Sequence, residues 1–248
     1  MLLKQTLESK TLALIVADDF RSVQVFEEYG LDFCCKGKRQ LNIACLEKGI
    51  PISDVLKKLE SLDNEPNNTQ RYSDWNTDFL IDYIIQQHHS YVKTMIPLIQ
   101  AHLQKVVNAH SAKHPEVSLI QELFVDMSTE LLSHLTQEET VVFPNLKKIV
   151  SQLVLAKSKL TNEHEFVKLI ENLEKEHLDV GKILGEIQLL TNGFTPPPGA
   201  CTTFRVLYQE LQAFQADMFR HIHLENNILF PKIMEMVTIS KSNSISNN

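Results

Sequence analysis

The sequence predicts an all-α protein, in which a four-helix bundle follows a small helical domain. Glycine is scarce, with 7 residues among 248, and few segments alternate between apolar and polar side chains as strands do. Four long segments instead repeat apolar residues with the period of an amphipathic helix. Their short connections are typical of an up-down-up-down bundle.

The first 61 residues are expected to form a separate unit of short helices. Helical patterns occur at about 12–17, 23–29, 41–48 and 53–60. A polar, turn-rich segment follows and is expected to be a linker. We therefore divide the chain into a small helical domain at 1–61, a linker at 62–73, the bundle at 74–237 and a flexible tail at 238–248.

The four bundle helices are expected at about 74–109, 117–150, 157–191 and 200–237. The first connection contains His114-Pro115, which interrupts a helix because proline lacks the backbone N–H. The last connection, residues 192–199, contains two glycines and three prolines. Such a segment ends one helix and leads in an extended form to the next.

Composition narrows the classes of function and location. The formal net charge is −7 with histidine neutral, which argues against a nucleic-acid-binding surface. No apolar run approaches the ~20 residues that span a bilayer, and the N-terminus does not resemble a signal peptide. We expect a cytoplasmic protein, whose four cysteines would then be reduced.

One unusual motif occurs twice, in the second and the fourth predicted helix. His134 and Glu138 are followed by Phe-Pro, as are His221 and Glu225, so both copies read H-x-x-x-E-x-x-x-x-F-P. Residues four apart share a helix face, and both pairs lie within the apolar stripe of their helix. A glutamate directed into a core is costly unless it is paired or bound to metal. The two pairs therefore predict a site that could hold two metal ions, with an exposed His/Glu contact as the alternative.

The other two helices offer further histidines. In the first helix a helical projection slightly favours His88 over His89 but does not choose between them. In the third, His164 aligns with the apolar residues of its helix and is expected to face inward. His177 fits that stripe poorly and is expected to be exposed. Imidazole with added carboxylates favours iron or manganese, and zinc remains a contender.

The chain resembles the di-iron "repair of iron centres" proteins, whose hemerythrin-like bundle follows a small Cys-Cys domain. The resemblance covers nearly the whole chain except the C-terminal tail. The matching segments are LDFCCKGKRQL at 31–41, DYII at 82–85 before His88-His89, EHE at 163–165, TPPP at 195–198, ACTTF at 200–204, and HIHLENNILFP at 221–231.

The resemblance implies a particular set of ligands. The family's first ligand lies eight residues before a proline, and Pro97 places it at His89. The implied centre contains two iron ions per chain, bridged by an oxo group and by carboxylates. Its ligands would be His89, His134, His164 and His221, with Glu138 and Glu225 as bridging carboxylates. Glu130 and Glu163 match acidic positions near the iron entry path of the family and are candidates for a supporting role.

The resemblance also implies repair of iron–sulfur clusters damaged by nitric oxide or peroxide. Iron donation and nitric oxide processing at the iron pair are both compatible with it, so enzymatic activity is left open. The expected partners are iron–sulfur proteins as clients and nitric oxide or oxygen species as small ligands, without nucleic acid or membrane; a homodimer is left open. The alternative is a hemerythrin-type protein that binds or senses dioxygen or nitric oxide, which would not need the Cys-Cys domain.

Cys34 and Cys35 are candidate functional thiols. Adjacent cysteines do not easily close an unstrained disulfide with each other. The basic residues Lys36, Lys38 and Arg39 follow them, and we expect them to lower the pKa values of the thiols and favour thiolate. The alternative is that both are small buried apolar residues. We expect Cys45 and Cys201 to be structural.

Overall fold

The structure is a computed structural model that describes residues 7–62, 71–154 and 163–245. The chain divides into two compact units: Met1–Leu80 with Ile222–Glu235, and Ile81–His221 with Met236–Asn248. Within the described residues every regular element is helical, apart from one isolated antiparallel bridge between Thr11 and Gln40. The all-α prediction is therefore confirmed.

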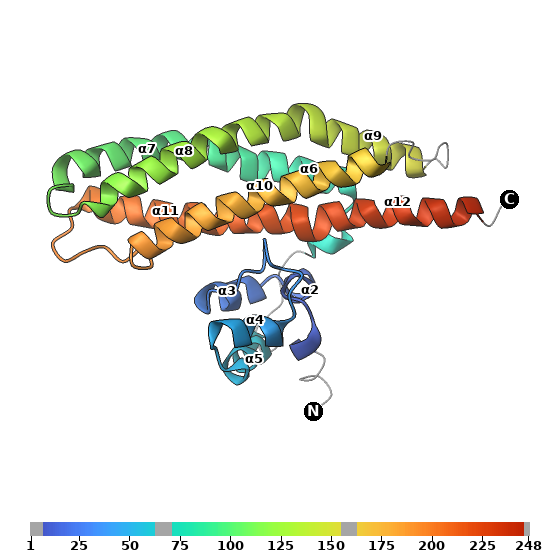
Figure 1. Ribbon diagram of the computed structural model, residues 1–248, viewed down its shortest axis with the longest axis horizontal. Coiled ribbons are helices and arrows are strands. Elements are labelled where there is room, and N and C mark those ends of the chain that lie inside the picture. Colours follow the sequence, from blue (N-terminus) through green and yellow to red (C-terminus); the bar gives the residue numbers. More distant parts are fainter. Residues whose placement is uncertain (1–6, 63–70, 155–162, 246–248) are drawn as a thin grey trace. The chain divides into compact units, whose positions relative to one another are not determined.

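The described part of the first unit includes four short α-helices before residue 63, and a 3-10 helix, η2 (Tyr72–Asp74), follows. The four α-helices are α2 (Leu12–Asp18), α3 (Ser22–Glu28), α4 (Leu41–Lys48) and α5 (Ile52–Ser61), as labelled in Figure 1. The Thr11 hydroxyl accepts a hydrogen bond from the Leu14 amide and caps α2. Gly49 ends α4 with a positive φ of 67°, a conformation in which glycine avoids the steric penalty of a Cβ. These helices match the expected ranges within one or two residues.

Part of the last bundle helix belongs to the same unit. Asn227 donates from Nδ2 to the carbonyl oxygens of Phe33, at 3.2 Å, and Cys34, at 3.0 Å. The His223 ring packs edge-on against Phe33, with ring centroids 5.7 Å apart. Burial lowers the pKa of His223 to about 4, so its ring is neutral at pH 7. The loop that carries the two adjacent cysteines is thus attached to this helix by hydrogen bonds and by aromatic packing.

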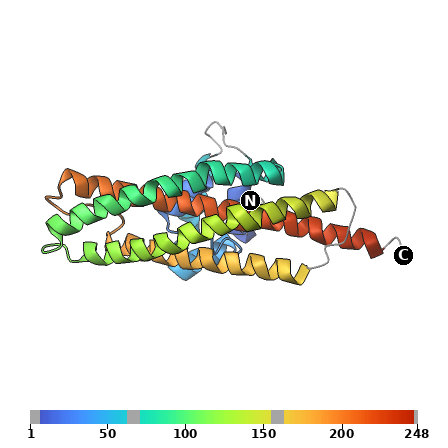
Figure 2. The same ribbon diagram turned by 90° about the horizontal axis from the view of Figure 1, so that it is seen from above.

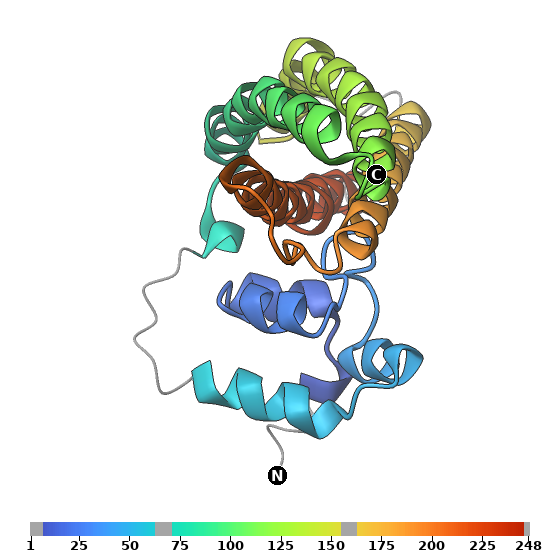
Figure 3. The ribbon, with the colours of Figure 1, turned by 90° about the vertical axis from the view of Figure 1, so that its left-hand side faces the viewer.

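The described helices from Thr77 onward form long rods that lie around a common axis in the end-on view of Figure 3. Figure 2 shows the same rods side by side along their length. The first rod contains α6 (Thr77–Tyr83), η3 (Ile84–His89) and α7 (Ser90–His110), and the second contains α8 (Glu116–Gln137), η4 (Glu138–Val142) and α9 (Phe143–Val154). The third rod is α10 (Glu163–Leu190). The fourth rod contains α11 (Thr202–His223), η5 (Leu224–Leu229) and α12 (Phe230–Ile245).

The rods agree with the predicted helices, with two exceptions at their ends. The residues expected to begin the third helix, 157–162, lie outside the described part of the chain. The expected tail at 238–248 is helical as far as Ile245. Apolar side chains fill the bundle axis, including Phe124, Phe204 and Phe214, each 0% exposed. None of the described helices combines the length and apolarity that crossing a membrane requires.

Two glycine substitutions are predicted to change stability in opposite directions. A Cβ at Gly37 would lie 2.3 Å from the Phe33 carbonyl oxygen and 2.8 Å from Asn227 Oδ1, whereas a Cβ at Gly185 meets nothing within 4 Å. Gly37→Ala should lower the free energy of unfolding by about 1–3 kcal/mol through overpacking. Gly185→Ala, inside α10, should raise it by about 0.5–1 kcal/mol. Urea unfolding followed by circular dichroism checks both, and a neutral Gly37→Ala would show that the loop is loosely packed.

Candidate metal centre

Six buried side chains from the four rods converge in two overlapping groups. The first contains His89, Glu138, His221 and Glu225, and the second contains His134, Glu138, His177 and Glu225. Within each group the potential ligand atoms all lie within 4.8 Å of one another. Their side chains are at most 8% exposed. Glu225 lies about one turn after His221 in the same continuous rod, so helix continuity fixes its position beside that histidine.

Glu138 faces both groups with different oxygens. Its Oε2 lies 3.5 Å from His89 Nε2, whereas its Oε1 lies 3.2 Å from His134 Nε2 and 4.0 Å from His177 Nε2. The side chain is 0% exposed, and within the described residues neither oxygen accepts a hydrogen bond. A buried carboxylate in this state is stable only beside positive charge. The two oxygens of Glu138 thus face different imidazoles, one in each group.

The imidazoles meet in pairs through their Nε2 atoms. His89 Nε2 lies 3.2 Å from His221 Nε2, and His134 Nε2 lies 3.1 Å from His177 Nε2. Ligands bound at about 2.1 Å around one metal ion have edges of roughly 3.0–3.4 Å. The nitrogen separations fit two imidazoles around one ion, and they equally fit an N–H···N hydrogen bond between neutral rings.

Outer carboxylates set the tautomers of two of these histidines. Glu139 Oε1 lies 2.9 Å from His89 Nδ1, and Glu176 Oε2 lies 2.5 Å from His134 Nδ1. A carboxylate only accepts, so Nδ1 carries the proton and the Nε2 lone pair points into the centre. Burial raises the pKa of Glu139, but hydrogen bonds from Lys93 and His89 outweigh it, so the pKa lies below its usual value. Lone pairs and carboxylates directed at one point require a cation, so the donor set fits a metal.

Three of the ligands lie on π-helical turns. These turns are η3, which ends at His89, η4, which begins at Glu138, and η5, which contains Glu225. A π-helical turn contains one more residue than an α-helical turn and shifts the phase of every side chain after it. This shift explains why a projection with a 3.6-residue period did not choose between His88 and His89.

The structure directs His89 into the centre and His88 to another partner. His88 Nδ1 lies 3.0 Å from Asp217 Oδ1. The His88 ring stacks on His221 with an interplanar angle of 7° and a centroid distance of 5.7 Å. His88 therefore packs against the His221 ring and is held there by its contact with Asp217.

The Phe-Pro step of each motif follows a π-helical turn. Pro144 is the second residue of α9, and Pro231 is the second residue of α12. A proline inside a helix removes one backbone hydrogen bond and clashes with the carbonyl four residues earlier. A wider turn before the proline accommodates both effects. The proline and the carboxylate ligand thus belong to one local structure, which accounts for their fixed spacing in the sequence.

The prediction for the third helix was wrong. His164 is exposed, whereas His177 is only 2% exposed and lies in the second group. Thirteen residues separate them, which corresponds to about 20 Å along the helix and roughly 220° around it. The buried stripe of α10 was readable in the sequence: Phe166, Ile170, Leu173, His177, Leu184 and Ile187 follow one another at helical spacing. No pattern in the sequence indicated that Glu139, Glu176 and Asp217 would contact the histidines of the centre.

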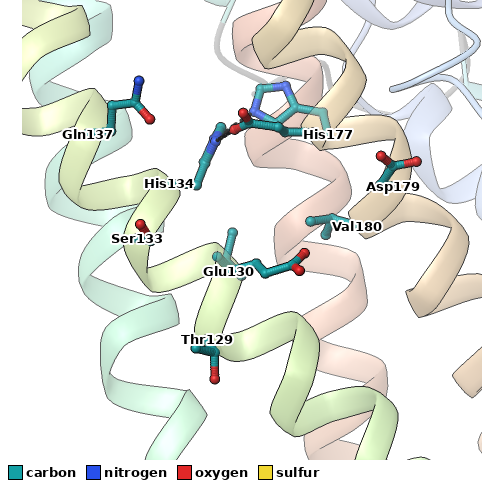
Figure 4. A pocket seen from close by; sticks show the side chains of 10 residues that line it. Thr129, Glu130, Ser133, His134, Gln137, His177, Asp179 and Val180 are labelled. Atoms are coloured by element: carbon teal, nitrogen blue, oxygen red, sulfur yellow. Dashed lines mark hydrogen bonds and ion pairs between the residues drawn. The ribbon is translucent and has the colours of Figure 1, made fainter.

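A cavity of about 430 Å³ lies between α8 and α10, beside the second group. Figure 4 shows Glu130 on one helix and Asp179 on the other, with His134 and His177 farther along the same cavity. Glu176 also lines it. Glu130 is thus close to the histidines, as the supporting role requires. The side chain of Glu163 lies outside the described part.

The expectation that basic neighbours lower the pKa values of the Cys pair is wrong for Cys34. Burial, the Cys35 thiol and the Asp32 carboxylate raise the pKa of Cys34 well above its usual value. The other two cysteines differ from each other. Cys45 is buried, as expected of a structural residue, whereas Cys201 is exposed and lies 3.2 Å from His110 Nε2.

Comparisons with known proteins agree with this architecture. The family model of the hemerythrin HHE cation binding domain matches residues 80–233, and that of ScdA_N, a domain of unknown function, matches residues 8–63. The iron–sulfur cluster repair protein ScdA of Staphylococcus epidermidis is 30% identical over 224 residues, 90% of this chain and 96% of its own.

Two further relatives cover a similar share. The iron–sulfur cluster repair protein YtfE of Pectobacterium atrosepticum is 31% identical over 214 residues, and a probable iron–sulfur cluster repair protein of Haemophilus influenzae is 31% identical over 216. Each match spans 86% of this chain and 91% of the relative. The fold and the converging ligands define a metal-binding bundle of the hemerythrin HHE class. The chain belongs to the family of iron–sulfur cluster repair proteins that includes ScdA and YtfE, which confirms the resemblance.

Replacing each of the two histidines of α10 is predicted to have a different effect on metal content, because one is a candidate ligand and the other is a surface residue. His177→Ala should lower the bound metal per chain because it removes one of the imidazoles of the second group. His164→Ala should leave metal content unchanged, since its side chain is exposed. Metal analysis compares the bound metal per chain of both variants with that of the unaltered protein. Equal loss in both variants, or loss only with His164→Ala, would contradict the assignment.

Proposed function

We propose that the protein binds two iron ions per chain in this centre. His89 and His221 would hold one ion, His134 and His177 the other, and Glu138 and Glu225 would bridge them. The observation that carries the proposal is that both ligand groups share the same two glutamates. A mixed set of imidazoles and carboxylates favours iron over zinc.

The surroundings of the centre suit entry of a cation. Glu130, Glu176 and Asp179 line the cavity beside His134 and His177. Carboxylates in a cleft raise the local concentration of divalent cations. The cavity also has room for a diatomic molecule, and a bound iron pair would supply redox chemistry and open coordination positions for dioxygen or nitric oxide.

The activity that fits this site and this family is repair of iron–sulfur clusters after nitrosative or oxidative damage. The relatives are named for that repair. Repair would proceed by donation of iron, by processing of nitric oxide at the iron pair, or by both. Its clients would be iron–sulfur proteins, and the place of action would be the cytoplasm.

The second candidate is a hemerythrin-type protein that binds or senses dioxygen or nitric oxide. Full burial of Glu138, His221 and Glu225 favours it, because a protein that retains its metal benefits from a closed centre. Incubation with a client enzyme that lacks its cluster distinguishes the repair function from the carrier or sensor function. A donor loses iron to the client as client activity recovers, whereas a carrier keeps its iron and the client stays inactive.

Removing a bridging glutamate tests the centre itself. Protein purified without added metal should contain about two irons per chain. Glu138→Ala and Glu225→Ala should each lower this content, because a bridging carboxylate binds both ions, while the long helices tolerate the small cavity. Glu122→Ala, an exposed position in α8, is the matched control and should keep its iron. Metal analysis beside circular dichroism reports both properties.

Zinc in the purified protein would overturn the iron assignment. Full iron retention in both bridging variants, with normal helicity, would overturn the bridged centre.

A further inference from the structure

A second group of potential metal ligands lies in the first unit. Asp32, Cys34 and Cys35 offer a carboxylate oxygen and two thiol sulfurs, all within 4.8 Å of one another. The Cys34 and Cys35 sulfurs are 3.7 Å apart, and Cys34 Sγ lies 3.3 Å from Asp32 Oδ1. The group contains no residue of the bundle centre.

These distances fit the coordination of one ion by all three residues. Two sulfurs bound at about 2.3 Å to a tetrahedral metal lie roughly 3.8 Å apart, and a sulfur and a carboxylate oxygen lie roughly 3.6 Å apart. Only small side-chain adjustments separate the observed arrangement from that geometry. Thiolates with one carboxylate select ions such as ferrous iron, zinc or cobalt over magnesium or calcium.

The two thiols form no disulfide and differ in their exposure to solvent. Their adjacency in the chain disfavours a disulfide between them. Cys34 is only 2% exposed, whereas Cys35 and Asp32 are half-buried. An ion held by the three residues would therefore face solvent on one side, where a fourth ligand from another molecule can bind.

The backbone around the group is held in place. Asp32 Oδ1 accepts hydrogen bonds from the amides of Cys35, at 2.9 Å, and Lys36, at 3.3 Å. Asn227 holds the carbonyl oxygens of Phe33 and Cys34 from the helix side. The three ligands thus need little ordering when an ion binds, which lowers the entropic cost of binding.

We propose that Asp32, Cys34 and Cys35 form a second metal site, with three protein ligands and one open position, for a thiophilic divalent cation. As the ion binds, each thiol proton passes to solvent and is replaced by a metal–sulfur bond. No change of oxidation state is involved. In the context of iron donation, which rests on the proposed function, a client thiolate would enter the open position and take the ion by ligand exchange.

Cobalt(II) is the probe for this site, added to the full-length protein after its bundle centre is loaded with iron. Thiolate ligands produce a sulfur-to-cobalt charge-transfer absorption, and the bundle centre contains no sulfur, so the band reports only cysteine ligation. One cobalt per chain should bind with this band. The band should disappear in the Cys34→Ser/Cys35→Ser double variant, and affinity should fall at least about tenfold in Asp32→Asn.

Two variants serve as controls. Cys201→Ser removes the exposed thiol beside His110, and Asp54→Asn removes an exposed carboxylate of the same unit; both should keep the full band. In the unaltered protein, cobalt should also protect Cys34 and Cys35 from alkylation but leave Cys201 reactive. That measurement needs no variant and holds even if a substitution disturbs folding.

Absence of the band, its loss in Cys201→Ser, or an unchanged affinity in Asp32→Asn would overturn the proposal. Iron content is measured on the same samples. A protein that keeps its iron but shows no band contradicts the second site alone, whereas one that never holds iron contradicts the bundle centre.

Discussion

The bundle centre depends on the convergence of buried imidazoles and carboxylates in the core of the helices. His89 and His221 approach within 3.2 Å through Nε2, and a buried carboxylate lies beside them. Glu139 and Glu176 place the protons of His89 and His134 on Nδ1, so the Nε2 lone pairs of these two rings and the carboxylate of Glu138 face the centre. In a dry interior such a set is costly on its own and favourable around cations. Packing of the helices therefore brings together a set of side chains that a cation would stabilise.

The helical backbone is adapted to this requirement in three places. Each of η3, η4 and η5 places a ligand and widens the rod at the level of the centre, as π-helical turns commonly do at functional sites. On the far side of η5, Asn227 holds the loop of the two cysteines. The turn that carries Glu225 is thus also the attachment point of the Cys loop.

Much of this was predictable from the sequence, and the failures have physical causes. Periodicity predicted the helices, and the repeated motif predicted which four side chains of the second and fourth rods converge. Periodicity left His88 and His89 open because η3 breaks the 3.6-residue phase. It chose His164 over His177 because the stripe was drawn through Leu160, Val167 and Leu178, whereas the buried stripe runs through Phe166, Ile170 and Leu173. The raised pKa of Cys34 was missed because it depends on Asp32 and on burial, which sequence distance to the lysines does not reveal.

Removal of the metal tests the central claim most directly. Hydrogen exchange, followed by mass spectrometry, should be compared between the metal-loaded protein and the same protein stripped by a chelator. We expect faster exchange at η3, η4 and η5 after stripping, because the converging carboxylates and imidazoles then lose the cation between them, with little change in the half of α7 that ends at His110. Equal exchange at the three π-helical turns in both forms would contradict that claim.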